Sequence, residues 1–107
     1  MDKQQFEEIE CFIDSLQHLS SHTRLAYQRD LTRLYDYCVS KQITDWQALD
    51  NSKLQQYIAS RHRTGVSGKS IQRGLSAVRR FYQYLLTHKK VTTNPAQGLV
   101  PPKSARH

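Results

Sequence analysis

Acidic residues are missing from the second half of this 107-residue chain. All nine Asp and Glu lie within residues 1–50 together with five Lys and Arg, whereas residues 51–107 hold eleven Lys and Arg. The first segment therefore has a net charge of −4 and the second a net charge of +11. This uneven distribution indicates a polyanionic partner more strongly than the overall net charge of +7 does, and it places the contact in the second half.

Proline and glycine are also scarce. The chain has three prolines, all at or after Pro95, and only four glycines. No segment alternates apolar and polar residues as a strand does, and no internal repeat is visible. The length fits one domain with a modest core. The composition therefore predicts a single all-α domain.

Cysteines and long apolar runs are few as well. Cys11 and Cys38 are too few for a disulfide framework and lack CxxC spacing, so we expect two reduced thiols. No apolar run approaches the roughly 20 residues that a membrane span needs. The first five residues are too polar for a signal peptide. We therefore expect a cytoplasmic protein that does not contact a membrane.

The spacing of apolar residues predicts four helices. They span about residues 4–17, 21–41, 51–63 and 68–88. Ser20 or Ser21, Asp50 and Ser67 stand where N-caps of the last three helices are expected. Because each helix has an apolar stripe that it cannot bury alone, the helices must pack on one another in a small orthogonal or bundle-like array.

The predicted helix over residues 68–88 has an apolar side and a cationic side. Its cationic side holds Lys69, Gln72, Arg73, Ser76, Arg80 and Gln83. No acidic residue of this helix interrupts that side, whereas an ordinary solvated face mixes both signs of charge. These residue types contact phosphates and base edges, and the start of the helix near Ser67 and Ser70 suits a phosphate. The pattern therefore favours a nucleic-acid contact.

The predicted helix over residues 21–41 offers a second polar side. That side comprises His22, Arg29, Thr32, Arg33 and Asp36, with Leu25 exposed among them. Because Asp36 interrupts the positive charge, a nucleic-acid contact and plain solvation fit this side equally well. Asp30 stands three residues before Arg33, and a pair that stabilises the helix is its simplest explanation.

We find no catalytic or metal-binding set in the sequence. His18 and His22 are separated by Ser20 and Ser21, which begin a new helix, so we do not expect them to bind a metal together. No glycine-rich phosphate loop is present. Trp46 and the tyrosines on apolar stripes are expected in the core. The sequence therefore predicts no cofactor.

Three segments of the chain, in this order, resemble one known family. Residues Ser21–Leu31 are similar to the second helix of the N-terminal core-binding domain of tyrosine recombinases, and Lys69–Tyr82 to its fourth helix. Asn94–Ala96 followed by Val100–Lys103 resembles its exit into a catalytic domain. The resemblance runs from about Phe6 to His107 and is closest to the bacterial Xer recombinases, to the XerC group more than the XerD group.

The resemblance implies a fold and a set of contact residues. The fold is a SAM-like orthogonal array of four helices over residues 1–98, and residues 99–107 start a linker. The second and fourth helices of this family lie near the major groove of the recombination site. The implied DNA contacts are His22, Thr23, Arg24, Ala26 and Arg29 in the second helix, and Lys69, Ser70, Gln72, Arg73, Ser76 and Arg80 in the fourth.

The resemblance also implies partners. They are a double-stranded DNA recombination site and, for the full-length enzyme, a XerD-like recombinase in a heterotetrameric synapse. In the family the first helix joins neighbouring protomers, and an exposed surface of Glu7, Glu8 and Cys11 is compatible with that. The catalytic Arg, Lys, His and Tyr would lie beyond His107, so we expect this chain to be monomeric and unable to cut DNA. The whole enzyme would resolve chromosome or plasmid dimers at cell division.

Three alternatives stay open on the sequence. The same domain occurs in phage and integron integrases. A helical adaptor between proteins would use the apolar grooves, with the basic half serving solubility. A helix-turn-helix regulator is a weaker fit, because the helix predicted over residues 68–88 is longer than that motif uses.

Overall fold

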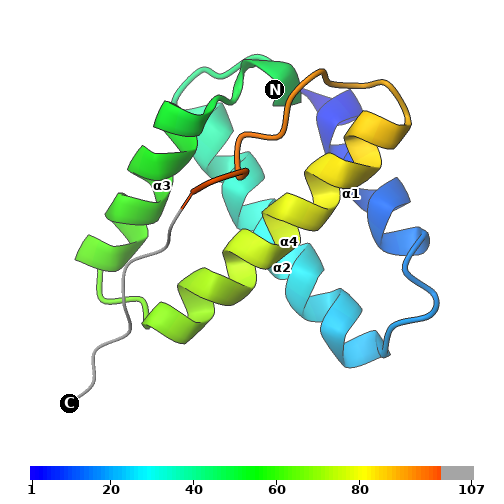
Figure 1. Ribbon diagram of the computed structural model, residues 1–107, viewed down its shortest axis with the longest axis horizontal. Helices are drawn as coiled ribbons and strands as arrows, with labels where there is room; N and C mark the ends of the chain where they lie inside the picture. The colour runs from blue at the N-terminus through cyan, green and yellow to red at the C-terminus, as the bar shows by residue number, and fades with distance from the viewer. Residues whose placement is uncertain (100–107) are drawn as a thin grey trace.

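Four α-helices account for most of the computed structural model, which describes residues 1–99 (Figure 1). The helices are α1 (Lys3–Asp14), α2 (Ser21–Ser40), α3 (Asn51–Arg63) and α4 (Gly68–Thr87). A short 3₁₀ helix, η1 (Trp46–Ala48), lies between α2 and α3. No strand occurs among residues 1–99. The predicted all-α class and the four predicted helices are therefore confirmed.

Side chains cap the start of every α-helix. Ser20, Asp50 and Ser67 each accept a hydrogen bond from the backbone N–H three residues later, as expected from the sequence. At α1, Asp2 accepts from the Gln4 N–H, while the Gln5 side chain accepts from the Asp2 N–H. These bonds satisfy donors that a helix start leaves free, so the helix boundaries follow from local chemistry.

The ends of α2, α3 and α4 share one backbone motif. In each, the residue after the C-cap has a positive φ, at Gln42 (59°), Gly65 (91°) and Lys89 (58°). The next N–H then donates to the third-last helical carbonyl, as from Lys90 to Leu85 at 2.8 Å. This is the Schellman motif, which usually places glycine at the positive-φ position. The chain uses glycine at only one of the three.

Helix α1 is shorter than the sequence pattern predicts. It ends at Asp14 rather than near Gln17, because the Ser15 hydroxyl donates to the Phe12 carbonyl and residues 15–18 continue as turns. Leu16 nevertheless remains buried. The apolar stripe therefore extends past the helix itself.

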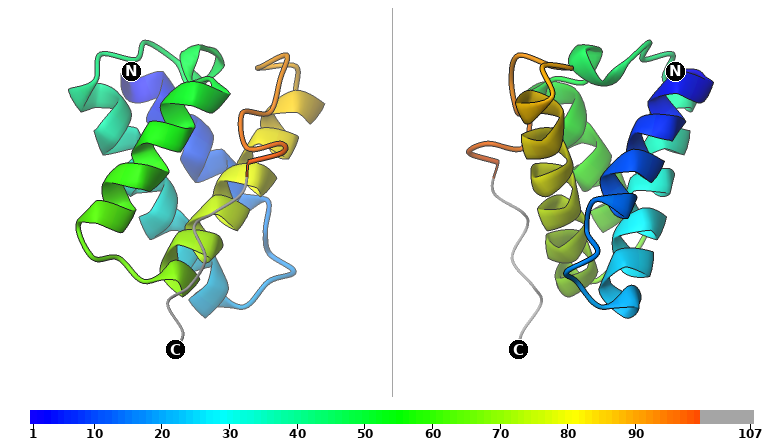
Figure 2. Two further views of the ribbon diagram at one scale, coloured as in Figure 1. Left: turned by 60° about the vertical axis from the view of Figure 1, so that its left-hand side comes forward. Right: turned by 90° about the vertical axis from the view of Figure 1, so that its right-hand side faces the viewer.

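Helices α2 and α4 cross near the middle of the molecule (Figure 1). Seen after a 90° turn, α4 lies on one side of the core, with α1 and α2 on the other (Figure 2). The first turns of α2 and α4 lie at the same end of the molecule, opposite the N-terminus (Figure 1). The largest fully buried side chains are Ile9, Leu31, Leu34, Cys38, Leu49, Leu54, Ile71, Leu75, Phe81, Tyr82 and Leu85.

The segment after α4 folds back on the helices. The Asn94 amide donates to the Arg79 carbonyl, and the Asn51 amide donates to the Pro95 carbonyl. Leu99, which the resemblance places in the linker, is buried in the core. The rest of the predicted linker lies outside the described residues. Within the described part of the chain, no helix is both long and apolar enough to span a membrane.

Candidate nucleic-acid interface

Five of the six predicted contact residues of α4 lie in its first half, and Arg80 follows in its second half. Lys69, Gln72 and Arg80 are exposed, while Ser70 and Ser76 are half-buried. The Ser70 hydroxyl accepts a hydrogen bond from the Ser67 hydroxyl at 3.1 Å. The Ser70 N–H donates to the Ser67 hydroxyl oxygen at 3.2 Å. Ser70 therefore takes part in capping α4, whereas the long polar side chains reach solvent.

The predicted contact residues of α2 are less uniform. His22 and Arg29 are exposed, while Thr23 and Ala26 are half-buried, and Thr23 accepts from the Ser20 cap at 3.0 Å. The half-buried Arg24 turns back, and its Nε donates to the Leu19 carbonyl at 3.4 Å. On α2, His22 and Arg29 are thus the predicted polar residues most open to a ligand.

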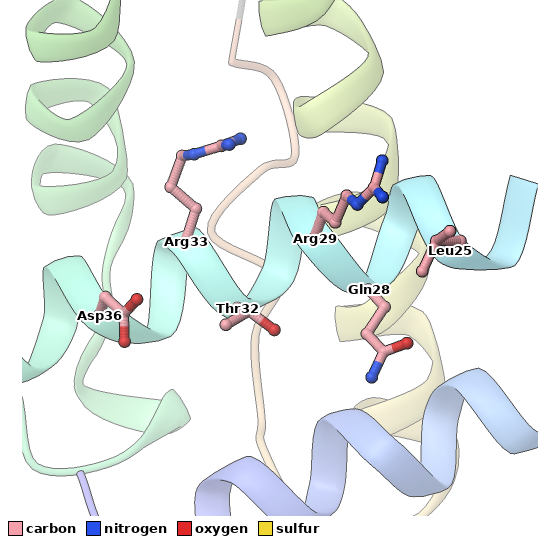
Figure 3. Close-up of a pocket in the computed structure, with 6 residues that line it drawn as sticks. All are labelled: Leu25, Gln28, Arg29, Thr32, Arg33 and Asp36. Carbon is pink, nitrogen blue, oxygen red and sulfur yellow. The ribbon is translucent and has the colours of Figure 1, made fainter.

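An open hollow lies on the outer surface of α2. Figure 3 shows Arg29 and Arg33 extending to one side of the helix, and Gln28 to the side on which α1 lies. These three, with Thr32, Asp36 and the exposed Leu25, line the hollow. The exposed Asp36 lines the same hollow as both arginines, so it adds a negative charge to this surface, as its position along the helix indicates. Arg33, which our contact set omits, joins Arg29, and their four-residue spacing could have indicated this.

Asp30 is the main electrostatic link between α2 and α4. Its carboxylate accepts from Arg73 twice, Nε to Oδ2 at 2.9 Å and Nη2 to Oδ1 at 3.0 Å. Arg33 Nη1 lies farther off, at 3.7 Å from Oδ1. The Asp30 side chain is 4% exposed and that of Arg73 is 49% exposed. The hydrogen bonds to Asp30 raise the pKa of Arg73 above its ordinary value.

This pairing corrects two expectations. The simplest sequence interpretation pairs Asp30 with Arg33 on the same helix, but its closer partner is Arg73 on α4. The cationic side of α4 also has an acidic neighbour after all, supplied by α2. A pair 43 residues apart in sequence depends on how the helices cross, so the spacing within one helix could not indicate it.

The acidic residues of α1 occupy a separate surface. Glu7, Glu10 and Cys11 are exposed. Glu8, expected to be exposed with them, is half-buried and lies 3.9 Å from Lys90. Burial raises the pKa of Glu8, and the positive charge of Lys90 opposes that rise. The negative charge of α1 is thus kept apart from the starts of α2 and α4.

The surface at the starts of α2 and α4 has features that suit an anion. Between residues 1 and 99, no three His, Cys, Asp or Glu side chains come together in a way that could hold a metal ion. The start of α4 presents the exposed Lys69, and the starts of α2 and α4 both present backbone N–H groups and the positive end of a helix dipole at the same end of the molecule. Such an arrangement attracts an extended anion.

A family comparison agrees with this architecture. Residues 9–89, more than half of the chain, match the family described as "Phage integrase, N-terminal SAM-like domain". The chain therefore belongs to this family. It is also similar to proteins named tyrosine recombinase XerC. The resemblance drawn from the sequence motifs and the SAM-like fold that it implied are thus confirmed.

Three relatives show the extent of this similarity. The tyrosine recombinase XerC of Azotobacter vinelandii is 39% identical over 102 residues, which make up 92% of this chain and 34% of that protein. The XerC of Pseudomonas fluorescens is 44% identical over 92 residues, covering 86% and 31%. That of Xylella fastidiosa is 43% identical over 88 residues, covering 82% and 30%. The chain thus spans about a third of the length of these relatives.

Proposed function

We propose that this chain is the DNA-clamping N-terminal domain of a XerC-type site-specific recombinase. The observation that carries the proposal is that α2 and α4, which start at the same end of the molecule and cross near its middle, both carry exposed cations, and that Arg73 of α4 is already paired to the buried Asp30 of α2. The exposed Lys69, Arg80 and Arg29 there suit phosphates, while Gln72 suits a base edge. The similarity to tyrosine recombinases supports duplex DNA as the extended anion.

The relatives support a proposal for the function of the whole protein. A tyrosine recombinase joins DNA to its nucleophilic tyrosine through a 3′-phosphotyrosyl bond and then exchanges strands. In a XerC-type enzyme, this domain holds one side of a half-site while a XerD-like partner occupies the other half-site. The proposed cellular role is the resolution of chromosome or plasmid dimers at cell division, in the cytoplasm. The same domain in a phage or integron integrase would use the same surface.

Salt dependence of duplex binding tests the proposal. Lys69, Arg80 and Arg29 have no carboxylate partner among residues 1–99, and the cluster of Arg33, Arg73 and Asp30 adds one net positive charge. Four neutralised phosphates give a slope of log affinity against log salt of about −3.6. Fluorescence anisotropy of a labelled duplex between about 0.05 and 0.2 M salt measures this slope. We expect it to be steep.

A matched pair of variants locates the contact. Arg80→Ala should reduce the steepness of the slope by about 0.9, because one phosphate contact is lost. Lys3→Ala removes the same charge from the exposed start of α1, near the opposite end of the molecule, and should leave the slope unchanged. A flat slope, or equal effects of the two variants, would contradict the proposal. Stoichiometric binding of a protein without any duplex binding would favour the adaptor alternative.

A further inference from the structure

Arg73 makes its hydrogen bonds to Asp30 with only part of its guanidinium group. An arginine side chain has five N–H donors. Asp30 accepts one from Nε and one from Nη2, which leaves the two donors of Nη1 and the second donor of Nη2. These remaining groups form the outer edge of the guanidinium, and the side chain is 49% exposed. One donor of Nη1 and the remaining donor of Nη2 point outward in parallel at this edge, so two parallel N–H donors are available to a ligand.

The position of Asp30 is fixed by the packing of α2 against α4. Its side chain is 4% exposed, and Arg33 lies on the same carboxylate at 3.7 Å. Gly74 of α4 faces it, since a Cβ built there would lie 3.8 Å from the Asp30 Cγ. The carboxylate holds the Arg73 guanidinium in one orientation before any ligand binds. The entropy cost of ordering a long side chain on binding is thereby reduced.

We propose that Arg73, oriented by Asp30, reads a guanine in the major groove. The inference rests on the proposed function and assigns the base that this residue recognises. Guanine presents two acceptors, N7 and O6, on its major-groove edge, and they match two parallel N–H donors. Asp30 is the positioning residue, since it contacts the DNA only through Arg73.

The charge of the pair favours a base over a phosphate. Asp30 neutralises Arg73 locally, and its carboxylate would repel a phosphate placed on the outer edge of the guanidinium. The guanine edge carries no net charge, so the neutralisation costs this contact little. Lys69 and Arg80, which stand on the same side of α4 without a described carboxylate partner, suit phosphates better.

Selection from a pool of duplexes with a randomised segment tests the inference. The wild-type chain should enrich duplexes with one constant guanine, and changing that guanine to adenine should weaken binding roughly 5- to 150-fold. Replacing it with 7-deazaguanine, which lacks the N7 acceptor, should also weaken binding. Arg73→Lys should reduce the sensitivity to both changes, because an ammonium group lacks the planar pair of N–H donors that Asp30 orients. Arg80→Lys is the matched control and should retain it.

Asp30→Asn separates positioning from simple electrostatics. Because the variant loses a negative charge, its affinity for unrelated duplexes should rise, while its preference for the guanine should fall. A purely structural role of Asp30 would lower both affinities together. Circular dichroism verifies folding, and the arms with Arg73→Lys and with modified DNA test the inference even where Asp30→Asn does not fold.

Two results would overturn the inference. Uniform weakening of all duplexes by Arg73→Lys, with the base preference retained, would make Arg73 a phosphate contact. Selection that yields no constant guanine would also overturn the inference. It would leave the proposed function intact, provided that the chain still binds DNA with a steep salt dependence. Absence of any duplex binding by the wild-type chain would contradict the proposed function, and the inference with it.

Discussion

Replacing glycine by alanine should have opposite effects at two positions of this chain. Gly74 lies inside α4, and a Cβ there would meet Asp30 Cγ at 3.8 Å and Oδ1 at 4.0 Å, which is ordinary van der Waals contact. Alanine is favoured over glycine in a helix interior by about 0.8–1.0 kcal/mol. We therefore expect Gly74→Ala to raise the free energy of unfolding by about that amount, and the Tm by about 4–8 °C.

Gly65 provides the matched control. Nothing lies within 4 Å of a Cβ built there, but its φ of 91° is one that a side chain disfavours. The cost of a left-handed conformation is about 1–2 kcal/mol, partly offset by the lower entropy of the unfolded alanine chain, so Gly65→Ala should lower stability by about 1 kcal/mol. Urea denaturation with an unchanged m-value measures both effects. Shifts of the same sign would refute the reasoning, and destabilisation by Gly74→Ala would mean that α2 and α4 pack more tightly than described.

Three further predictions concern the helix ends and the core. Lys89→Gly should stabilise the protein by about 0.5–1 kcal/mol in urea denaturation, because Lys89 holds a φ of 58° at the end of α4; a loss of stability would contradict this. Tyr82→Phe should lower the free energy of unfolding by about 1–3 kcal/mol in the same assay, because the Trp46 carbonyl loses the hydroxyl that donates to it at 2.6 Å. An unchanged stability would mean that water replaces this donor. Burial raises the pKa of Cys38 to about 12. At pH 8 a thiol reagent should therefore modify the exposed Cys11 at once and Cys38 only on unfolding. Equal modification rates of the two thiols would contradict the burial of Cys38.

Features set by neighbouring residues were predictable from the sequence. The bounds of α3 and the caps Asp50 and Ser67 agree with the structure, because an N-cap depends on a side chain and a backbone N–H three residues apart. The buried stripe of α4 likewise follows from a 3.6-residue period. The premature end of α1 was missed, because the bond from the Ser15 hydroxyl to Phe12 competes with helix continuation.

Features that depend on the crossing of helices were not predictable. The pairing of Asp30 with Arg73 joins two helices, and the sequence pattern places Asp30 with the nearer Arg33 instead. Likewise, the position of Arg24 along α2 fits a contact residue, but its Nε lies against the Leu19 carbonyl. Periodicity says which side of a helix is polar, whereas the partner of each polar group depends on which element packs beside it.

Mapping of backbone amide shifts during a duplex titration tests the central claim most directly. The ¹⁵N-labelled chain is titrated with a duplex at low salt, and the shift of each amide is followed. We predict that the largest shifts fall within residues 21–33 of α2 and 69–80 of α4, while residues 7–14 of α1 move little. Shifts centred on α1, or none at saturating duplex, would contradict a DNA-binding surface at the starts of α2 and α4.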